Sequence, residues 1–335
     1  MEQSARNSSR TAVEIATQPD CWRRAAEAAA GAPGLPLPGE RVAVTGCGTS
    51  WFMAQAYAAL REAAGQGETD AFAASEFPAA RAYDRVVAIT RSGTTTEVLA
   101  LLTALRGRTP TLALTADPKT PVMEAADAVA VLDWADEESV VQTRFATTAL
   151  AFLRAGLQTH GPLPAGVRTV AEAAADAETA VAEPLPPSVL AAGQWTFLGC
   201  GWAYGLAQEA ALKMREAAGA WTEAYPAMEY RHGPIAITAP GRVAWVFGPR
   251  PEGLAADITA TGGTLIADGS RLDPMADLIR AQRLAVAVAE SRNHNPDHPR
   301  NLTRSVILPT DWRLRGCRVP TPPPPRGGGA AGPRT

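Results

Sequence analysis

The chain has 335 residues, and its 31 Lys and Arg against 34 Asp and Glu give a formal net charge of −3. It lacks the basic excess of nucleic-acid-binding chains, and no apolar run reaches the roughly 18–20 residues that a membrane helix needs. The composition therefore excludes nucleic acid and membrane as expected partners, and at roughly 100–200 residues per domain the length predicts two soluble domains.

The N-terminus and the cysteines indicate the compartment. The first thirty residues are polar and lack the apolar core of a signal peptide. The four cysteines are scattered, without the paired spacing of a zinc site or the density of a disulfide scaffold. We therefore expect a cytoplasmic protein.

Short apolar runs in the first half predict buried parallel strands, because a loop and then apolar residues at helical spacing follow them. Helices are predicted directly after Ser50 and after Thr96, and the second of them ends near Gly107. Strands that alternate with helices in this way form a doubly wound sheet, so the predicted fold class is α/β. The predicted strands are 41–45, 85–90, 111–115 and 126–132.

A proline-rich stretch at 161–193 interrupts this pattern and predicts a connection between two domains. Further strands are predicted at 194–198, 242–247 and 264–267. The last residues are rich in Pro and Gly, which is typical of disorder. The predicted organisation is an N-terminal helical segment (1–35), a first domain (36–165), a linker (166–190), a second domain (191–316) and a disordered tail (317–335).

The two halves share a short sequence pattern. Gly-Cys-Gly at 46–48 recurs at 199–201, and Ala-Gln at 54–55 recurs at 207–208 with the same spacing. In both halves the pattern follows a predicted strand and precedes a predicted helix. This placement suggests a duplicated α/β domain.

The loop after the first strand is the first candidate site. Gly48, Thr49 and Ser50 lie where a glycine turn lets the free amides of the next helix face an anion. Trp51 replaces the third glycine of the dinucleotide fingerprint and no Walker A sequence follows, so nucleotide cofactors are disfavoured. A glycine turn without a ligand is the alternative interpretation.

A second candidate loop runs from Thr90 to Thr96 and includes Ser92 and Thr95. One hydroxyl is enough to cap a helix, and capping alone is the simpler interpretation. Five hydroxyl residues among seven at a predicted helix N-terminus favour a phosphate cradle instead. The ligand would be a phosphate monoester, because no ribose or base reader is apparent.

Charged residues in the helix predicted at 207–218 form the third candidate. Glu209, Lys213 and Glu216 can share one face at their spacing of four and three residues. Such spacing is usually a solvated salt-bridge ladder, but the neighbouring residues are small or apolar and predict burial. A buried carboxylate has a raised pKa, which suits proton transfer near neutral pH.

The histidines give one further candidate. His232 precedes a Gly-Pro pair in a loop, where a plain surface histidine is the alternative. His294, Asp297 and His298 are disfavoured as metal ligands, because Pro296 and Pro299 break any helix that would present them together and no cysteine joins them. We expect neither a metal nor a cofactor.

Together these motifs resemble the tandem sugar isomerase (SIS) domain family. The sequence is similar to the isomerase half of glutamine:fructose-6-phosphate aminotransferase and to standalone amino-sugar-phosphate deaminases, isomerases and fructosamine deglycases. The resemblance covers about residues 10–310 and implies two similar domains, each a mostly parallel, flavodoxin-like sheet flanked by helices. The matching motifs are GCGTS at 46–50, SGTTTE at 92–97, ESVVQTR at 138–144, ALKMRE at 211–216, EYRHGP at 229–234 and DHPRNLTRS at 297–305.

The resemblance implies a role for each matching residue. Glu216 matches the base that moves a proton between C1 and C2 of the sugar, and Lys213 matches the lysine that accompanies it. His232 matches a histidine that assists ring opening and reaches across a homodimer into the partner's site. The residues that match the phosphate-binding positions are Ser50, Ser92 and Thr95, with Thr90 where the family often has Ser and with Gly48 and Thr49 in the same loops.

Two positions depart from the synthases of the family. Arg304 stands where they carry a lysine that forms a Schiff base, and arginine stays protonated and cannot serve as that nucleophile. Gln142 stands where they have a substrate-contacting serine. Both are predicted substrate contacts, and both weigh against imine-dependent amination.

The resulting prediction is a cytoplasmic, homodimeric enzyme with sites at the subunit interface that acts on a phosphorylated amino sugar. Proton abstraction at C2 of glucosamine 6-phosphate or N-acetylglucosamine 6-phosphate would give isomerisation and deamination. The alternatives are dehydration of N-acetylglucosamine 6-phosphate, deglycation of a fructosamine 6-phosphate, and a non-catalytic phosphosugar sensor.

Overall fold

The computed structural model of the chain describes residues 8–78, 80–267 and 271–309. The tail predicted to be disordered at 317–335 lies outside the described residues. No described helix is long and apolar enough to cross a membrane.

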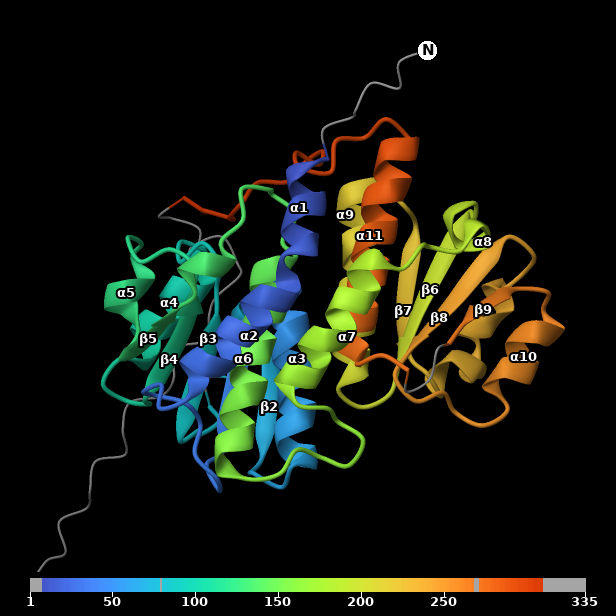
Figure 1. Cartoon of the computed structure of the whole chain (residues 1–335). Helices are drawn as coiled ribbons and strands as arrows, with labels where there is room; N and C mark the ends of the chain where they lie inside the picture. Colours follow the sequence, from blue (N-terminus) through green and yellow to red (C-terminus); the bar gives the residue numbers. More distant parts are fainter. Residues whose placement is uncertain (1–7, 79, 268–270, 310–335) are drawn as a thin grey trace, which may run out of the picture.

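The first half forms a five-stranded parallel sheet in the order β2-β1-β3-β4-β5 (Figure 1). Its strands are short and rich in Val, Ala and Leu, as expected for strands that are covered on both faces. Alternate residues of β3 pack on opposite sides: Val87 and Ile89 join the core on the face of α3 and α6, and Val86 and Ala88 join the face of α4 and α5. The strands are β1 (Val42–Gly46), β2 (Thr69–Ala73), β3 (Arg85–Ile89), β4 (Thr111–Thr115) and β5 (Ala128–Val131).

The second half repeats this arrangement with four parallel strands in the order β7-β6-β8-β9. Trp195, Trp245 and Phe247 pack beneath α9 and α11, whereas Val246 faces the short helix α10. Both sheets therefore have helices on both faces. The strands are β6 (Gln194–Gly199), β7 (Thr222–Pro226), β8 (Arg242–Phe247) and β9 (Thr264–Ile266).

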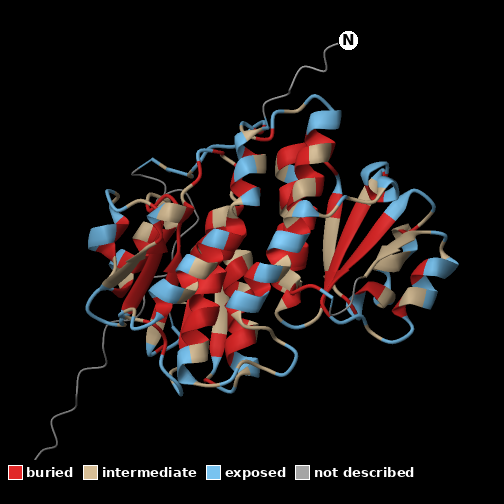
Figure 2. Cartoon of the chain, viewed as in Figure 1, coloured by how far each residue is buried: buried red, intermediate tan, exposed pale blue. Residues whose placement is uncertain are grey.

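A layer of helices lies between the two sheets (Figures 1 and 2). One continuous hydrophobic cluster contains strand residues of both sheets, for example Val87 and Phe197, together with helix residues from this layer. The α-helices are α1 (Arg10–Ala16), α2 (Gln18–Ala29), α3 (Thr49–Ala63), α4 (Thr96–Leu105), α5 (Val122–Ala125), α6 (Arg144–His160), α7 (Val170–Ala182), α8 (Pro187–Leu190), α9 (Ala203–Ala218), α10 (Leu254–Ala260) and α11 (Pro274–Ser291). The 3-10 helices are η1 (Ala74–Glu76), η2 (Asp133–Ala135), η3 (Glu229–His232) and η4 (Pro234–Ile237).

The α/β fold class and the seven predicted strands are confirmed, with shifts of one or two residues at half of their ends. The edge strands β2 and β7 were not predicted, because their sequences, TDAFA and TEAYP, mix polar and small residues. Residues 166–190, predicted as a linker, contain α7, whose buried alanines pack against α2 and α11. The domain boundaries stay a prediction.

Candidate active site

The two candidate loops of the first half meet at the carboxyl ends of β1 and β3. These strands are neighbours, and their connections leave to opposite sides of the sheet, which makes this the point where ligands bind in doubly wound folds. Gly48 has φ +55°, a conformation that L side chains rarely adopt, so the turn into α3 requires glycine there. The fold therefore brings the two loops into one site.

Together the loops line a cavity of about 210 Å³ that also reaches the other half of the chain. Its wall includes Glu216 of α9 and the segment 302–306 near the described C-terminal end. The predicted site residues along this wall are Gly48, Thr49, Ser50, Thr90, Ser92, Thr95, Gln142, Glu216 and Arg304.

The hydroxyl groups of the second loop are not occupied in helix capping. Thr95 is the N-cap residue of α4, yet its side chain makes no capping hydrogen bond. The hydroxyl of Thr90 is buried and has no hydrogen-bond partner in the described structure. Ser92 Oγ accepts from Thr94 Oγ1 at 3.0 Å. Because buried polar groups are normally paired, the free hydroxyls favour a ligand over the simple capping interpretation.

Helix α9 places its three charged residues beside the first loop. Lys213 Nζ donates to Thr49 Oγ1 at 3.0 Å, lies 3.4 Å from Glu209 Oε1 and pairs with Glu216. The side chains of Glu209 and Lys213 are 0% and 1% exposed, whereas that of Glu216 is 20% exposed and faces the cavity. A solvated salt-bridge ladder is therefore wrong for this helix.

Close packing of α9 on α3 makes this contact possible. A Cβ built on Gly205 would lie 2.5 Å from the carbonyl oxygen of Phe52, closer than real Cβ atoms come to backbone. Only glycine allows the two helices to approach this closely. The approach brings Lys213, two turns further along α9, within reach of Thr49 at the start of α3.

Burial and charge shift the pKa values of this group. Burial raises the pKa of Glu209 to about 8; the ammonium of Lys213 opposes the shift and the carboxylate of Glu216 adds to it. Burial lowers the pKa of Lys213, but the carboxylates of Glu209 and Glu216 outweigh it, so the net shift is upward. Lys213 thus stays protonated, as a donor or electrostatic partner, and Glu216 is the carboxylate left at the cavity.

Arg91 is a cavity residue that was not among the predicted site residues. Its buried guanidinium lies 3.4 Å from Glu137 and donates to the carbonyls of Ser139 and Val140 at 3.1 Å and of Arg304 at 3.5 Å. It therefore holds together three segments of the cavity wall. In the sequence, Arg91 could have been noticed as a cation within a run of Ser and Thr residues.

The segment 302–308 closes one side of the cavity by pairing with the hydroxyl loop. Ser305 accepts a hydrogen bond from Thr94 Oγ1 at 2.9 Å, and the amide of Thr96 donates to the carbonyl of Val306 at 3.2 Å. The amide of Leu308 donates to Thr96 Oγ1 at 2.9 Å.

The guanidinium of Arg304, in the same segment, donates to the carbonyl of Glu137 and pairs with Asp136. The side chain of Arg304 is thus already paired with two residues that lie outside the cavity lining.

The imidazole of His232 and the thiol of Cys47 do not contribute a reactive group to the cavity of this chain. His232 is exposed on η3 and does not line the cavity. Cys47 does line it, but burial raises the pKa of its thiol to about 11, so the thiolate is scarce near neutral pH. Among the described residues no three His, Cys, Asp or Glu side chains come together as a metal site.

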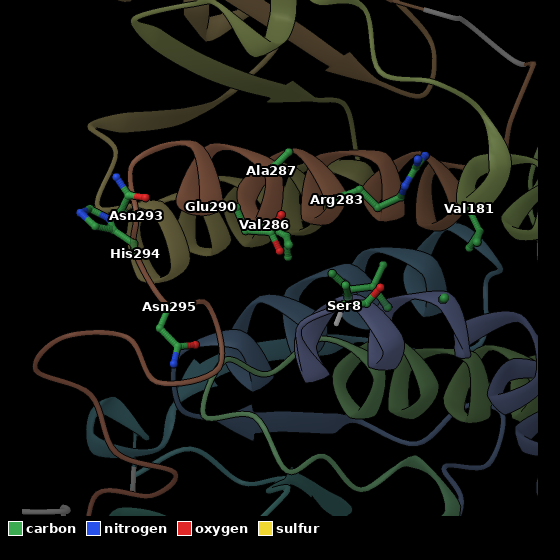
Figure 3. A pocket seen from close by; sticks show the side chains of 12 residues that line it. Ser8, Val181, Arg283, Val286, Ala287, Glu290, Asn293, His294 and Asn295 are labelled. Atoms are coloured by element: carbon green, nitrogen blue, oxygen red, sulfur yellow. The ribbon is translucent and has the colours of Figure 1, made fainter. Parts of the chain in front are cut away.

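A larger cavity of about 730 Å³ lies elsewhere, between α1, α7 and α11 (Figure 3). Val286 of α11 faces α1 across it, and the loop residues Asn293, His294 and Asn295 stand at one end. None of the predicted site residues lines it. The smaller cavity is the candidate active site, because that is where the unpaired hydroxyls and the buried charges meet.

Comparisons with known proteins find relatives and similar folds. No protein-family model matches the chain. The chain is 27% identical over 328 residues to a glutamine–fructose-6-phosphate aminotransferase (isomerizing) from Synechocystis sp., covering 80% of this chain and 51% of the relative. The chain thus spans about half the length of this curated relative.

Solved structures show the same fold at lower identity. A glucosamine-6-phosphate deaminase from Thermotoga maritima superposes with a TM-score of 0.73 at 23% identity, over 90% of this chain and 100% of the other. The C-terminal domain of the glucosamine-fructose-6-phosphate aminotransferase from Francisella tularensis gives 0.68 at 20% identity, over 89% and 100%. The matches support homology to the isomerase domain of these aminotransferases. The deaminase and deglycase relationships and the tandem-domain architecture stay predictions.

Proposed function

We propose that the chain is an enzyme that binds a 6-phosphorylated amino sugar and moves a proton between C1 and C2. One observation carries this proposal: a single cavity joins the hydroxyl loops of the first half, including the unpaired hydroxyl of Thr90, to the carboxylate of Glu216 from the second. The likeness to proteins whose names include glucosamine-6-phosphate deaminase and fructose-6-phosphate aminotransferase supports the sugar phosphate as substrate.

The phosphate would bind between the two loops of the first half. Ser50, Ser92, Thr90 and Thr95 offer hydroxyl donors near the N-terminal ends of α3 and α4, where the helix dipoles favour an anion. The cavity of about 210 Å³ suits a small ligand. Gln142, which also lines the cavity, would contact the sugar.

Glu216 would act as the base. Its carboxylate lines the cavity and pairs with Lys213, whose pKa is raised despite its burial. Removal of the C2 proton of glucosamine 6-phosphate and its return at C1 leaves an imine at C2. Water then hydrolyses this imine to ammonia and fructose 6-phosphate, so no oxidant, reductant or cofactor is required.

His232 would complete the site from a second copy of the chain. In one copy it is exposed and lies outside the cavity. We infer that a homodimer brings the partner's loop to the open side of the cavity, where the histidine assists ring opening. In mixed dimers of a Glu216→Gln chain and a His232→Ala chain, one site of the two keeps both groups. Partial activity is expected there, and confirmed mixed dimers without activity would refute the shared site.

Proton NMR in D₂O tests the reaction. Glucosamine 6-phosphate is expected to lose its C2 proton signal and to give ammonia and fructose 6-phosphate. A new unsaturated sugar from N-acetylglucosamine 6-phosphate, without ammonia, would establish dehydration instead. Binding of both sugars without any exchange at C2 would contradict the enzyme and favour the phosphosugar sensor.

A further inference from the structure

The larger cavity, of about 730 Å³, has no part in the proposed reaction, because it shares no residue with the cavity of the hydroxyl loops. It is a trough between helices α1, α7 and α11 (Figure 3). Its volume falls within the range of small-molecule sites, roughly 300–1,000 Å³. The side chains that line it therefore indicate which small molecule it could hold.

The middle of the trough is apolar. Ala12 and Ile15 line it from α1, and Val286 and Ala287 line it from α11. Three of these four side chains are alanine or valine, which are short and leave space between the two helices. Water in such a space is displaced favourably by an apolar group.

The two charged residues of α11 that line the trough differ in their partners. Arg283 donates to the carbonyls of Ala180 and Glu183 at 2.7 and 2.6 Å, so its guanidinium serves the end of α7. Glu290 lies two turns further along α11. Within the described residues its side chain forms neither an ion pair nor a hydrogen bond. The charge that the trough leaves unpaired is therefore negative.

Hydrogen-bond acceptors gather at the same end as Glu290. Asn293, with φ 56°, turns the chain at the end of α11, and the amide of His294 donates to the carbonyl of Ala289 at 2.8 Å. Both side chains line the trough, and Figure 3 shows them beside the end of α11. An amide oxygen and the free nitrogen of a neutral imidazole accept hydrogen bonds, as a carboxylate does. An ammonium group, with three donors and no acceptor, matches this end.

We propose that the larger cavity binds an organic amine, with the apolar body of the amine in the trough and its ammonium group on Glu290, and that this amine is an effector of the candidate active site. Charge complementarity selects the amine, because the carboxylate of Glu290 would repel a carboxylate or phosphate at that end. Helix α1 supplies the connection to the active site.

Helix α1 lies between the two cavities. Its residue Glu14 is buried and accepts hydrogen bonds from the amides of Glu138 at 2.6 Å and Ser139 at 3.3 Å. The carbonyls of Ser139 and Val140 accept in turn from Arg91 at 3.1 Å. Val140 and Arg91 line the candidate active site. One side of α1 thus lines the trough, while another holds a segment of the active-site wall.

A ligand between α1 and α11 restrains α1 in the position in which Glu14 holds this wall. This part of the proposal rests on the proposed function, which places the sugar phosphate beside Arg91. We expect glucosamine 6-phosphate to bind about fivefold more tightly when the amine is bound. Because such coupling is reciprocal, the amine should bind more tightly by the same factor when the sugar phosphate is present.

Calorimetric titration of the chain with 2-phenylethylamine and 2-phenylethanol tests the site, because the two probes share an apolar body and differ in the ammonium group. We expect the amine to bind about tenfold more tightly, as for one charge-assisted contact. Glu290→Gln should remove that difference. Ala287→Phe fills the trough and should abolish binding of both probes. Glu27→Gln, at an exposed position of α2 that does not line the trough, is the matched control and should change neither.

Equal affinity of the amine and the alcohol, or equal effects of Glu290→Gln and Glu27→Gln, would overturn the amine site. Absence of amine binding, together with a change of oligomeric state in Ala287→Phe, would show that a second copy of the chain covers the trough instead. Amine binding that leaves the affinity for glucosamine 6-phosphate unchanged would overturn the effector role. Failure of the proposed function looks different: the amine would then bind through Glu290, and glucosamine 6-phosphate would not bind at all.

Discussion

The two halves of the molecule use the same strand order for different tasks. The order of the strands is equivalent in the two sheets, β2-β1-β3-β4 in the first and β7-β6-β8-β9 in the second. The turns into α3 and α9 both contain a glycine with φ near +55°, Gly48 and Gly201. In the first half the site is built from helix N-termini and hydroxyl loops. In the second half it is built from the later turns of α9, which carry Lys213 and Glu216.

Under the proposed function, this difference assigns phosphate binding to one half and proton transfer to the other. The first half has five hydroxyls between Thr90 and Thr96, whereas its counterpart after β8, residues 248–253, reads GPRPEG and has none. A hydroxyl loop is a good anion cradle but contains no base near neutral pH. A buried helix can hold a carboxylate and an ammonium together, which gives the reacting end of the ligand its proton chemistry.

The largest expected effect tests the catalytic half. Glu216→Gln keeps the size of the side chain but removes the proposed base, so turnover should fall by about 10²–10⁴-fold, while binding of the sugar phosphate persists. Steady-state kinetics and calorimetry measure the two properties. Glu223→Gln, on β7 of the same half, is the control that should keep full turnover. Undiminished activity of Glu216→Gln would remove Glu216 as the base.

Removing hydroxyls tests the binding half. Ser92→Ala with Thr95→Val takes two donors from the proposed phosphate site, so the dissociation constant for glucosamine 6-phosphate should rise by about 10–100-fold. Thr103→Val on the exposed side of α4 removes a hydroxyl that bonds only to Leu99 O and should change nothing. Unchanged affinity of the double variant would place the phosphate elsewhere.

The pH dependence of stability tests the buried carboxylate. The pKa of Glu209 is raised to about 8 in the folded chain, above its unfolded value, so the folded chain keeps this proton when the unfolded chain loses it. The stabilisation is present at low pH and is lost as the pH rises towards 8, by roughly 2–3 kcal/mol between pH 6 and pH 8. Urea unfolding should show this loss in the native sequence and not in Glu209→Gln; the same slope in both chains would contradict it.

Variants of the two equivalent glycines can distinguish an effect on stability from an effect on phosphate binding. Gly48→Ala and Gly201→Ala each force a side chain into positive φ, so both should lower the free energy of unfolding by about 1–2 kcal/mol. Only Gly48→Ala should also weaken phosphate binding, because Gly201 lies in the half without the hydroxyl loop. Thermal unfolding and phosphate titration check the pair. Equal effects of the two variants on phosphate binding would contradict the proposal that only the first half binds the phosphate.

The sequence predicts the strongly patterned parts of the fold. The inner strands are predicted because they are apolar throughout, and the hydroxyl loops because Ser92, Thr95 and their neighbours exceed what one helix cap needs. β2 and β7 are not predicted, because their sequences mix polar and small residues. The position of Arg91 in the site and the larger cavity are not predicted either, because both depend on segments that meet only in the folded chain.

The helix layer between the sheets affects how the protein unfolds. One hydrophobic cluster includes Val87 of the first sheet and Phe197 of the second, so neither half can lose its structure without exposing apolar surface of the other. We therefore expect the described parts of the two halves to unfold together. The proposed phosphate cradle and base lie on opposite sides of this seam, so a partly unfolded molecule that binds without the capacity to react has no stable existence.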